Sequence, residues 1–310
     1  MTTNSIPDPF YKGKVRDLYQ VGDSMLLIVA SDRISAFDVV FNEPIEGKGE
    51  ILTNVSTRWF QHFREGKTIS ITQNGISDSR PIEIILDFDD HIISDNIEDY
   101  PQPFKNYEPF RNRSILAKRT NRIDFECVVR GYLAGSGFKD YQQTGSICGH
   151  KLPAGLLQGD KLPSPIFTPA TKEEIGQHDQ NVSIQYMKDK IGNELTNRLE
   201  EISIALFNEA SKQMARTGIL LCDTKFEFGL LDDRIVLIDE ALTPDSSRYW
   251  DEAYYKPGET APGFDKQYIR DYLESTGWNK TPPPPPFPAQ VIDKTIGLYR
   301  EIDRRISLVI

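Results

Sequence analysis

The sequence predicts a protein of two lobes around a cleft, built from both β-sheet and α-helix. Its 310 residues exceed the usual size of one domain, so a large core shared by two lobes is expected. Apolar residues alternate with polar ones in some segments and recur at helical spacing in others, which predicts strands and long helices in one chain. The sequence contains neither an internal repeat nor an apolar run long enough to cross a bilayer.

The amino-terminal part has the pattern of a sheet covered by one helix. Residues 11–31 predict a hairpin that turns at Gly22-Asp23, and residues 51–63 place apolar side chains at helical spacing. Further strands are predicted at 68–72, 82–86, 114–118 and 127–130.

Glycine and proline are frequent in the middle of the chain, where residues 131–171 predict surface loops. An amphipathic helix is then predicted at 195–214, followed by strands at 219–231 and 235–239 that flank a turn at Asp232-Asp233. The proline run 282–286 predicts a stiff spacer before a last helix at 289–304.

Charge and cysteine content exclude several classes of protein. The formal net charge of −10 disfavours non-specific binding to nucleic acid, which depends on a surplus of Lys and Arg. Cys127, Cys148 and Cys222 lie far apart, so neither a disulfide framework nor a zinc site is predicted. The first nine residues lack the basic segment and apolar core of a secretion signal. We therefore expect a cytoplasmic protein that has small molecules as partners, with no nucleic acid and no membrane.

A basic cluster lies at the start of the first predicted hairpin. Lys12, Lys14 and Arg16 alternate with Gly13 and Val15. Such a segment suits a polyphosphate, because glycine lets the backbone come close and lysines neutralise charge. The alternative is a solvated edge strand whose lysines only discourage aggregation. Neither a Walker A motif nor a GxGxxG fingerprint is present, so a P-loop or Rossmann protein is not indicated.

Two further clusters lie on or directly after predicted strands. Ser35 and Asp38 belong to the motif Ser-Asp-Arg-Ile-Ser-Ala-Phe-Asp, which either faces a ligand or forms a capping turn. Glu126 and Arg130 share one face of their strand. They form either an ion pair of little energetic value or a site in which Glu126 holds a metal and Arg130 grips a carboxylate or phosphate.

The predicted strand after the amphipathic helix is strongly charged on one side. Alternation places Asp223, Lys225 and Glu227 on one face and two phenylalanines on the other, which indicates a wet cleft face and a dry core face. A solvent-exposed strand has a similar pattern. The next strand delivers Asp239, and paired acids at adjacent strand ends predict a site for Mg²⁺.

Five motifs, in the same order along the chain, resemble the SAICAR synthetase family. They are Tyr-Lys-Gly-Lys-Val-Arg-Asp-Leu-Tyr, Ser-Asp-Arg-Ile-Ser-Ala-Phe-Asp, Glu-Cys-Val-Val-Arg-Gly-Tyr-Leu-Ala-Gly-Ser, Asp-Thr-Lys-Phe-Glu-Phe-Gly and Asp-Glu-Ala-Leu-Thr-Pro-Asp-Ser-Ser-Arg-Tyr-Trp. Each motif alone is weak, but five in order are specific. The match spans residues 11–256 and includes the loop that ends at His178-Asp179, whereas the stretch after Lys256 carries no motif with a role.

The resemblance implies an α+β fold with two lobes and an active site between them. Residues 1–118 would form a kinase-like antiparallel sheet lobe for the nucleotide, and residues 119–310 an ATP-grasp-like lobe that includes the last helix. The implied reaction joins L-aspartate to carboxyaminoimidazole ribonucleotide (CAIR) at the expense of ATP. It gives SAICAR, ADP and phosphate in purine biosynthesis, through an acyl phosphate. The implied cofactors are ATP and Mg²⁺, in a monomer or a small homo-oligomer.

The resemblance also implies roles for the charged residues. The nucleotide would contact Lys12, Gly13, Lys14, Val15, Arg16, Lys118 and Glu227. Mg²⁺ would be held at ATP by Glu227 and Asp239, and at the imidazole carboxylate by Glu126 and Asp179. The other substrates would contact Ser35, Asp38, Arg130, Ser136, Arg248 and Lys256. The catalytic candidates are Lys14, Arg130, Asp223 and Lys225.

Other functions fit the residues less well. A different ATP-dependent kinase or carboxylate–amine ligase would share the fold but not the motifs on the substrate side of the cleft. An inactive regulatory protein would be favoured by loss of Lys14, Glu227 or Asp239, and all three are present. A nucleic-acid-binding module is disfavoured by the acidic balance and by the lack of a recognition motif.

Overall fold

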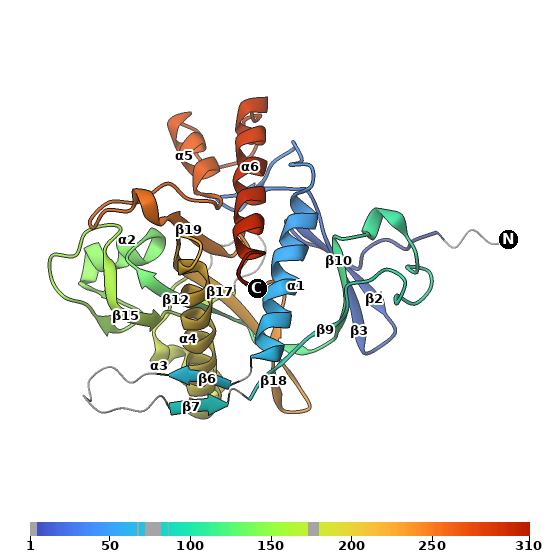
Figure 1. Cartoon of the computed structure of the whole chain (residues 1–310), viewed down its shortest axis with the longest axis horizontal. Coiled ribbons are helices and arrows are strands. Elements are labelled where there is room, and N and C mark those ends of the chain that lie inside the picture. The colour runs from blue at the N-terminus through green and yellow to red at the C-terminus, as the bar shows by residue number, and fades with distance from the viewer. Residues whose placement is uncertain (1–4, 67, 72–81, 86, 173–179) are drawn as a thin grey trace.

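The computed structural model describes residues 5–66, 68–71, 82–85, 87–172 and 180–310. Two main sheets with helices beside them give an α+β architecture (Figure 1). Among the described residues, no helix is both long and apolar enough to span a membrane. Cys127, Cys148 and Cys222 are free cysteines, and Cys127 and Cys222 are buried.

The first sheet has five antiparallel strands in the order β1-β2-β3-β10-β9. Their bounds are Tyr11–Lys12 (β1), Arg16–Val21 (β2), Met25–Ala30 (β3), Ile92–Ser94 (β9) and Ser114–Lys118 (β10). One face packs Leu27 and Val29 against Phe104 and Phe110, next to a 3-10 helix at Glu108–Phe110. The other face carries Ile28 toward the rest of the molecule.

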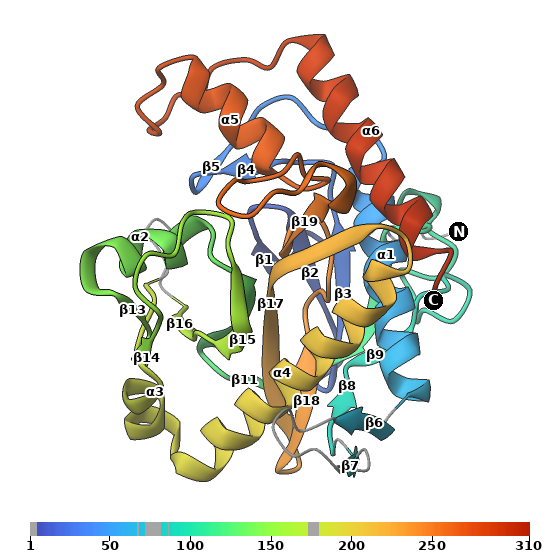
Figure 2. The same ribbon diagram turned by 60° about the vertical axis from the view of Figure 1, so that its left-hand side comes forward.

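The second sheet follows the order β15-β12-β17-β18-β8, with β11, β16 and β19 paired to it as well. Its strands are Asp89–Asp90 (β8), Asn121–Arg122 (β11), Phe125–Tyr132 (β12), Lys161–Phe167 (β15), Ala170–Thr171 (β16), Ile219–Leu231 (β17), Arg234–Ile238 (β18) and Ser247–Asp251 (β19). The pairing is antiparallel except between β18 and β8. The long strand β17 runs through the middle of the molecule in Figure 2 and organises this sheet.

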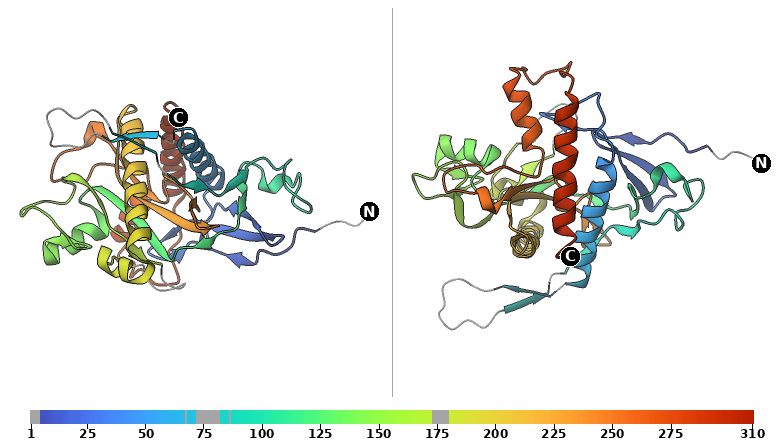
Figure 3. Two further views of the ribbon diagram at one scale, coloured as in Figure 1. Left: turned by 90° about the horizontal axis from the view of Figure 1, so that it is seen from below. Right: turned by 45° about the horizontal axis from the view of Figure 1, so that its top comes forward.

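Helices lie against these sheets and against one another. They are Lys48–Glu65 (α1), Gly135–Thr144 (α2), Ile184–Ile191 (α3), Asn193–Ala215 (α4), Gln267–Ser275 (α5) and Ala289–Ile306 (α6), with a 3-10 turn at Glu252–Tyr254. Small two-stranded units complete the fold at Ser35–Ala36 (β4) with Val39–Val40 (β5), Thr68–Ile71 (β6) with Ile82–Ile85 (β7), and Ser146–Ile147 (β13) with His150–Lys151 (β14). Helix α4 packs on β17 and β12, and α1 lies beside α6 (Figure 3).

Most predicted elements are confirmed within a few residues, including the first hairpin, α1, β10, β17 and α6. The prediction of loops at 131–171 is wrong, because this segment contains α2 and β15. Two prolines inside β15 concealed it. Proline is tolerated there because β15 lies at the edge of its sheet. The lobe boundary after Lys118 stays a prediction.

The main core joins helix α1 to the second sheet and to α6. Trp59 of α1 is fully buried and stacks on Phe63, with ring centroids 5.5 Å apart. On the other side of the same cluster, Phe226 and Phe228 of β17 are also 0% exposed. This core fixes α1, and therefore the start of α1, relative to β17.

Trp59→Ala should lower the free energy of unfolding by about 3–5 kcal/mol, because it leaves a large cavity in a core that cannot close around it. Urea unfolding followed by circular dichroism measures this change. Gln61→Ala, on the exposed side of the same helix, should stay within about 0.5 kcal/mol of the unchanged protein. Equal losses in the two variants would contradict the placement of α1.

Candidate active site

The charged face of β17 is the centre of the site. Strand β12 pairs with it so that Arg130 lies opposite Asp223 and Val128 opposite Lys225. The side chains of Lys225 and Glu227 are in contact on this face, while the phenylalanines between and after them point into the core. The predicted alternation of a charged and a dry face is thus confirmed.

Lys225 is held between two buried carboxylates. Its Nζ donates to Glu126 Oε1 at 2.7 Å and to Glu227 Oε1 at 3.1 Å. Burial alone would lower the pKa of Lys225, but the charges of Glu227, Glu126 and Asp239 outweigh it and raise this pKa well above the ordinary value. Lys172 forms an ion pair with Glu227 from the other side. The ammonium of Lys225 therefore stays charged between these carboxyl groups.

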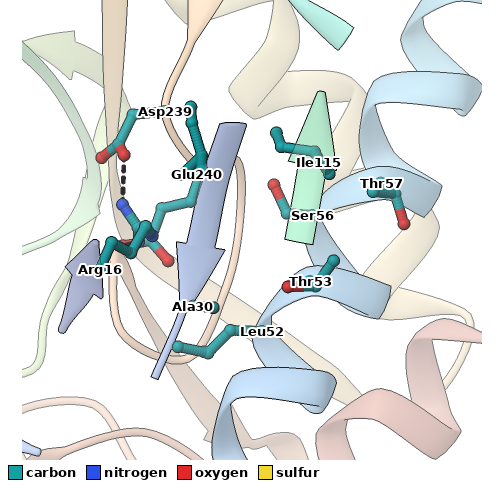
Figure 4. Close-up of a pocket in the computed structure, with 10 residues that line it drawn as sticks. Arg16, Ala30, Leu52, Thr53, Ser56, Thr57, Ile115, Asp239 and Glu240 are labelled. Carbon is teal, nitrogen blue, oxygen red and sulfur yellow. Dashed lines mark hydrogen bonds and ion pairs between the residues drawn. The ribbon is translucent and has the colours of Figure 1, made fainter. Parts of the chain in front are cut away.

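Arg16 connects the first sheet to the end of β18. Figure 4 shows its guanidinium pointing at Asp239, and it also forms an ion pair with Glu240. Burial would raise the pKa of Asp239, but the charges of Arg16, Lys172 and Lys225 lower it below the usual range. Beside this contact lies a cavity of 20 Å³, bordered by α1 and β3 as well, with room for about one water molecule. Arg16 therefore keeps Asp239 ionised at the junction of the sheets.

A second cluster of charge lies where β12 leads into α2. Arg130 donates to Thr168 Oγ1 and to Ser136 Oγ, both at 3.0 Å, and its Nη1 lies 3.6 Å from Asp223 Oδ2. Arg248 of β19 forms an ion pair with the same carboxylate. Two guanidinium groups therefore converge on one partly buried acid, and the charge of Asp265 also acts on Arg248.

The glycines at the start of α2 make room for these arginines. A Cβ atom added to Gly135 would lie 3.0 Å from Arg248 Nη2, and one added to Gly137 would lie 3.1 Å from Arg130 Cδ. No side chain caps the first turn of α2. Helix amino termini attract anions, so this end of α2, the two arginines and the hydroxyl of Ser136 together suit a phosphate group.

The basic loop after β1 is fixed by Arg33. Its guanidinium donates to the carbonyl oxygens of Gly13 and Lys14 and binds Asp17 through both carboxylate oxygens. The carbonyl of Val15 accepts from the backbone and side chain of Ser31. Sequence reasoning found the motif but missed Arg33 as the residue that shapes it, although Arg33 lies in the second motif. The loop thus presents a defined backbone.

Lys14 forms an ion pair with Asp38, which brings the first and second motifs together. Ser35 lies in the same small hairpin, on β4. Lys12 is exposed on β1, on the same edge of the sheet. These positions agree with a shared ligand-binding surface, and the roles themselves stay predictions.

Three predicted site residues stand apart from these clusters. Lys118 lies at the end of β10, where its Nζ donates to the carbonyl of Asp90 at 3.3 Å. Lys256 is exposed in the loop after β19, and no side-chain contact of Lys256 to the clusters is found in the described parts of the chain. Asp179 lies outside the described residues.

Sequence reasoning missed a buried network that supports the loop before β19. The carboxylate of Asp245 accepts from Lys48 Nζ at 2.8 Å and from the Tyr299 hydroxyl at 2.8 Å, and Lys266 Nζ lies 3.0 Å from it. Ser246 of the same loop accepts from the backbone nitrogen of Lys225 at 3.0 Å. The only signal in the sequence was Asp245 inside the fifth motif, because its partners come from distant helices.

The predicted metal ligands come from neighbouring strands. Glu227 lies opposite Ile238 in the register of β17 and β18, next to Asp239. In the described part of the chain, no group of three or more His, Cys, Asp or Glu side chains is arranged to hold a metal ion. Lysine and arginine side chains contact these acids, so the metal assignment stays a prediction.

Comparisons with known proteins bear on the whole chain. The family model of SAICAR synthetase matches residues 9–285. A phosphoribosylaminoimidazole-succinocarboxamide synthase of Leptospira interrogans is 46% identical over 296 residues, which cover 96% of this chain and 95% of that protein. A SAICAR synthase from Saccharomyces cerevisiae, solved in complex with SAICAR, is 34% identical with a TM-score of 0.78, covering 96% and 93% of the two chains. A SAICAR synthetase in complex with ADP shares the fold at 24% identity, with a TM-score of 0.63 and coverage of 96% of each chain.

The fold and the charged strand face, taken with these likenesses, define an α+β enzyme of the carbon–nitrogen ligase class. The chain belongs to the SAICAR synthetase family. Enzymes of this family ligate L-aspartate to CAIR with ATP, in purine biosynthesis. The predicted family, fold class and reaction are confirmed.

Arg16→Met should move acid unfolding to higher pH. The lowered pKa of Asp239 contributes stability above the unfolded value of about 3.9, and this stability is lost as pH falls through the folded pKa. Without the guanidinium, burial raises the pKa of Asp239, so the stability is lost earlier in an acid titration. Circular dichroism against pH measures the midpoint. Arg111→Gln, which removes an exposed pair with Glu108, is the control, and an unchanged midpoint in Arg16→Met would contradict the assignment.

Proposed function

We propose that this chain forms SAICAR through an acyl phosphate, with the nucleotide and CAIR bound at the two charge clusters of β17. Strand β17 itself is the main support for this proposal. It places Asp223 next to the arginine that binds it, and Glu227 next to Lys225. Four residues of strand span about 13 Å. This distance suits a ribonucleotide that reaches from a phosphate site to a phosphoryl donor.

We propose that the nucleotide binds against the first sheet, at the loop after β1 and the end of β10. Lys12 and Lys14, with the backbone of Gly13 and Val15, would contact its phosphates, and Lys118 at the end of β10 would lie beside its base. Phosphoryl transfer depends on positioning and charge neutralisation, which this loop supplies through two ammonium groups and a backbone fixed by Arg33.

Mg²⁺ fits the donor set of the acidic cluster. Its preferred ligands are carboxylate oxygens together with phosphate oxygens, and Asp239 stays ionised because of its cationic neighbours. We propose Glu227 and Asp239 as holders of Mg²⁺ at ATP, and Glu126 with Asp179 at the imidazole carboxylate. Mg²⁺ would neutralise negative charge on the phosphate groups of ATP. Lys172 and Lys225 already neutralise Glu227 and would exchange partners when the ion binds.

CAIR is proposed to place its phosphate at Arg130, Arg248 and Ser136, at the amino terminus of α2. Its carboxylate would then point along β17 toward Lys225. A carboxylate oxygen attacks the γ-phosphorus of ATP, and ADP leaves. The amine of aspartate then attacks the acyl carbon, phosphate leaves and the nitrogen loses a proton. Lys225 would stabilise the negative charge at the reacting carboxyl group, while Ser35, Asp38 and Lys256 would border the aspartate and imidazole.

The proposal includes a cytoplasmic location and small molecules as the partners, in a monomer or a small homo-oligomer. The acidic composition supports the exclusion of nucleic acid. Size-exclusion chromatography with light scattering measures the oligomeric state.

The direct test follows ADP release by the purified protein with ATP, Mg²⁺ and CAIR, with and without L-aspartate. We expect turnover that depends on aspartate and yields the succinocarboxamide. Brief incubation without aspartate, followed by trapping with hydroxylamine, should give the hydroxamate of CAIR if an acyl phosphate forms. Aspartate-dependent product without any trapped hydroxamate would leave the ligase activity and overturn the acyl phosphate.

Glu227→Gln should lower kcat at least about 100-fold while the protein stays folded, because it removes a charged ligand of Mg²⁺ and keeps the shape of the side chain. Initial rates at increasing Mg²⁺ check this, with urea unfolding as the test of folding. Glu274→Gln, far from both clusters, is the matched control. Full activity of Glu227→Gln at ordinary Mg²⁺ would falsify the metal assignment.

A further inference from the structure

The hairpin that carries Ser35 and Asp38 has an unfavourable turn. Its two central residues, Phe37 and Asp38, have φ values of 51° and 63°. Two-residue hairpin turns with positive φ at both positions favour Asn-Gly, and a bulky residue in this region is uncommon. Such backbone conformations persist where the surrounding structure holds them. The Phe37 ring makes contacts that can supply part of this support.

These contacts come from the segment between α5 and α6. The ring of Trp278 lies edge-on to Phe37 with centroids 6.5 Å apart, and edge-on to Phe41 at 5.5 Å. Lys280 Nζ lies 4.1 Å from the centroid of the Phe37 ring, which is a cation–π contact. Phe287, after the proline run, stacks on Phe41 at 4.4 Å. Figure 2 shows α5 beside β4 and β5, so the carboxyl-terminal segment covers this hairpin.

Asp38 is the next residue after Phe37 and forms the ion pair with Lys14. A change in the position of the Phe37 ring therefore moves the carboxylate that orients Lys14. Lys280 is half exposed and also pairs with Glu274 at 2.7 Å. Its side chain is therefore not part of the hydrophobic core. Contacts therefore connect Lys280 to the ring of Phe37, and the neighbouring Asp38 to Lys14.

We propose that Trp278 and Lys280 are positioning residues for the active site, which hold the Phe37–Asp38 turn so that Asp38 keeps Lys14 in place. We call Phe37, Phe41, Trp278 and Lys280 the aromatic clamp. The inference rests on the proposed function, in which Asp38 borders the substrates. This proposal assigns a role to the segment before the proline run, which contains none of the five sequence motifs.

The test compares Lys280→Met, Lys280→Arg and Glu274→Gln. Lys280→Met should lower kcat/KM for L-aspartate about two- to fivefold, the range expected for loss of an exposed cation–π contact. Lys280→Arg should restore it, because a guanidinium also lies well over an aromatic ring. Glu274→Gln should match the unchanged enzyme, since it removes only the ion pair. All three variants should stay folded, with a urea midpoint no more than slightly below that of the unchanged protein, because each substitution alters only exposed contacts.

A double-variant cycle separates positioning from a general effect on structure. Phe37→Gly removes the ring and accepts a positive φ without support. Lys280→Met should therefore have no further effect on kcat/KM when Phe37→Gly is already present. An equal loss in both backgrounds, or no loss from Lys280→Met alone, would overturn the proposal.

A second readout does not depend on turnover. Trp59 and Trp250 are buried, so acrylamide quenching of the protein's fluorescence reports mainly on Trp278. Phe37→Gly should raise this quenching, because one side of the indole loses its neighbour. Unchanged quenching would overturn the clamp. If the unchanged protein shows no aspartate-dependent turnover while Phe37→Gly raises quenching, the proposed function fails and the clamp contact stands.

Discussion

The ammonium of Lys225, held between Glu126 and Glu227, constrains how the strands of the second sheet pair around it. Removing charges from water is costly unless each finds a partner, and here Lys225 contacts both carboxylates while Lys172 pairs with Glu227 as well. The contact fixes the register of β12 on β17, which places Arg130 opposite Asp223. A slip of one residue would turn the charged face of β17 into the core under α4. Packing and active-site geometry are therefore set together.

Contacts between the two sheets are polar as well as apolar. Arg16 reaches from β2 to the acids after β18, and Lys48, at the start of α1, donates to Asp245 in the loop before β19. Truncating one partner of a buried ion pair leaves the other charge unpaired, which is more costly than losing a surface pair. These links hold the first sheet, α1 and the second sheet in one arrangement, which would keep the two proposed ligand sites at fixed relative positions.

The local sequence pattern was sufficient to predict β17. Charged residues and phenylalanines alternate strictly, so only the phenylalanine face can point into the core. It was insufficient for α2, since Gly135 and Gly137 have low helix propensity, and the reason for them is the close approach of two arginines from other strands. Arg16 was assigned to the nucleotide, whereas its observed partner Asp239 is 223 residues away, a separation that no local rule reaches. The candidate site was thus found as separate motifs, and their mutual contacts required the fold.

The claim that the nucleotide and CAIR bind at two separable sites, one at the loop of Lys14 and one at Arg130, is tested most directly by equilibrium binding. Calorimetric titrations of ADP with Mg²⁺, and of CAIR, would be made with Lys14→Gln and Arg130→Lys. We predict that Lys14→Gln weakens ADP and leaves CAIR nearly unchanged, while Arg130→Lys weakens CAIR and leaves ADP unchanged, because a lysine cannot replace a two-pronged guanidinium. The reverse pattern, or equal loss of both ligands in folded Arg130→Lys, would contradict the assignment of the two clusters.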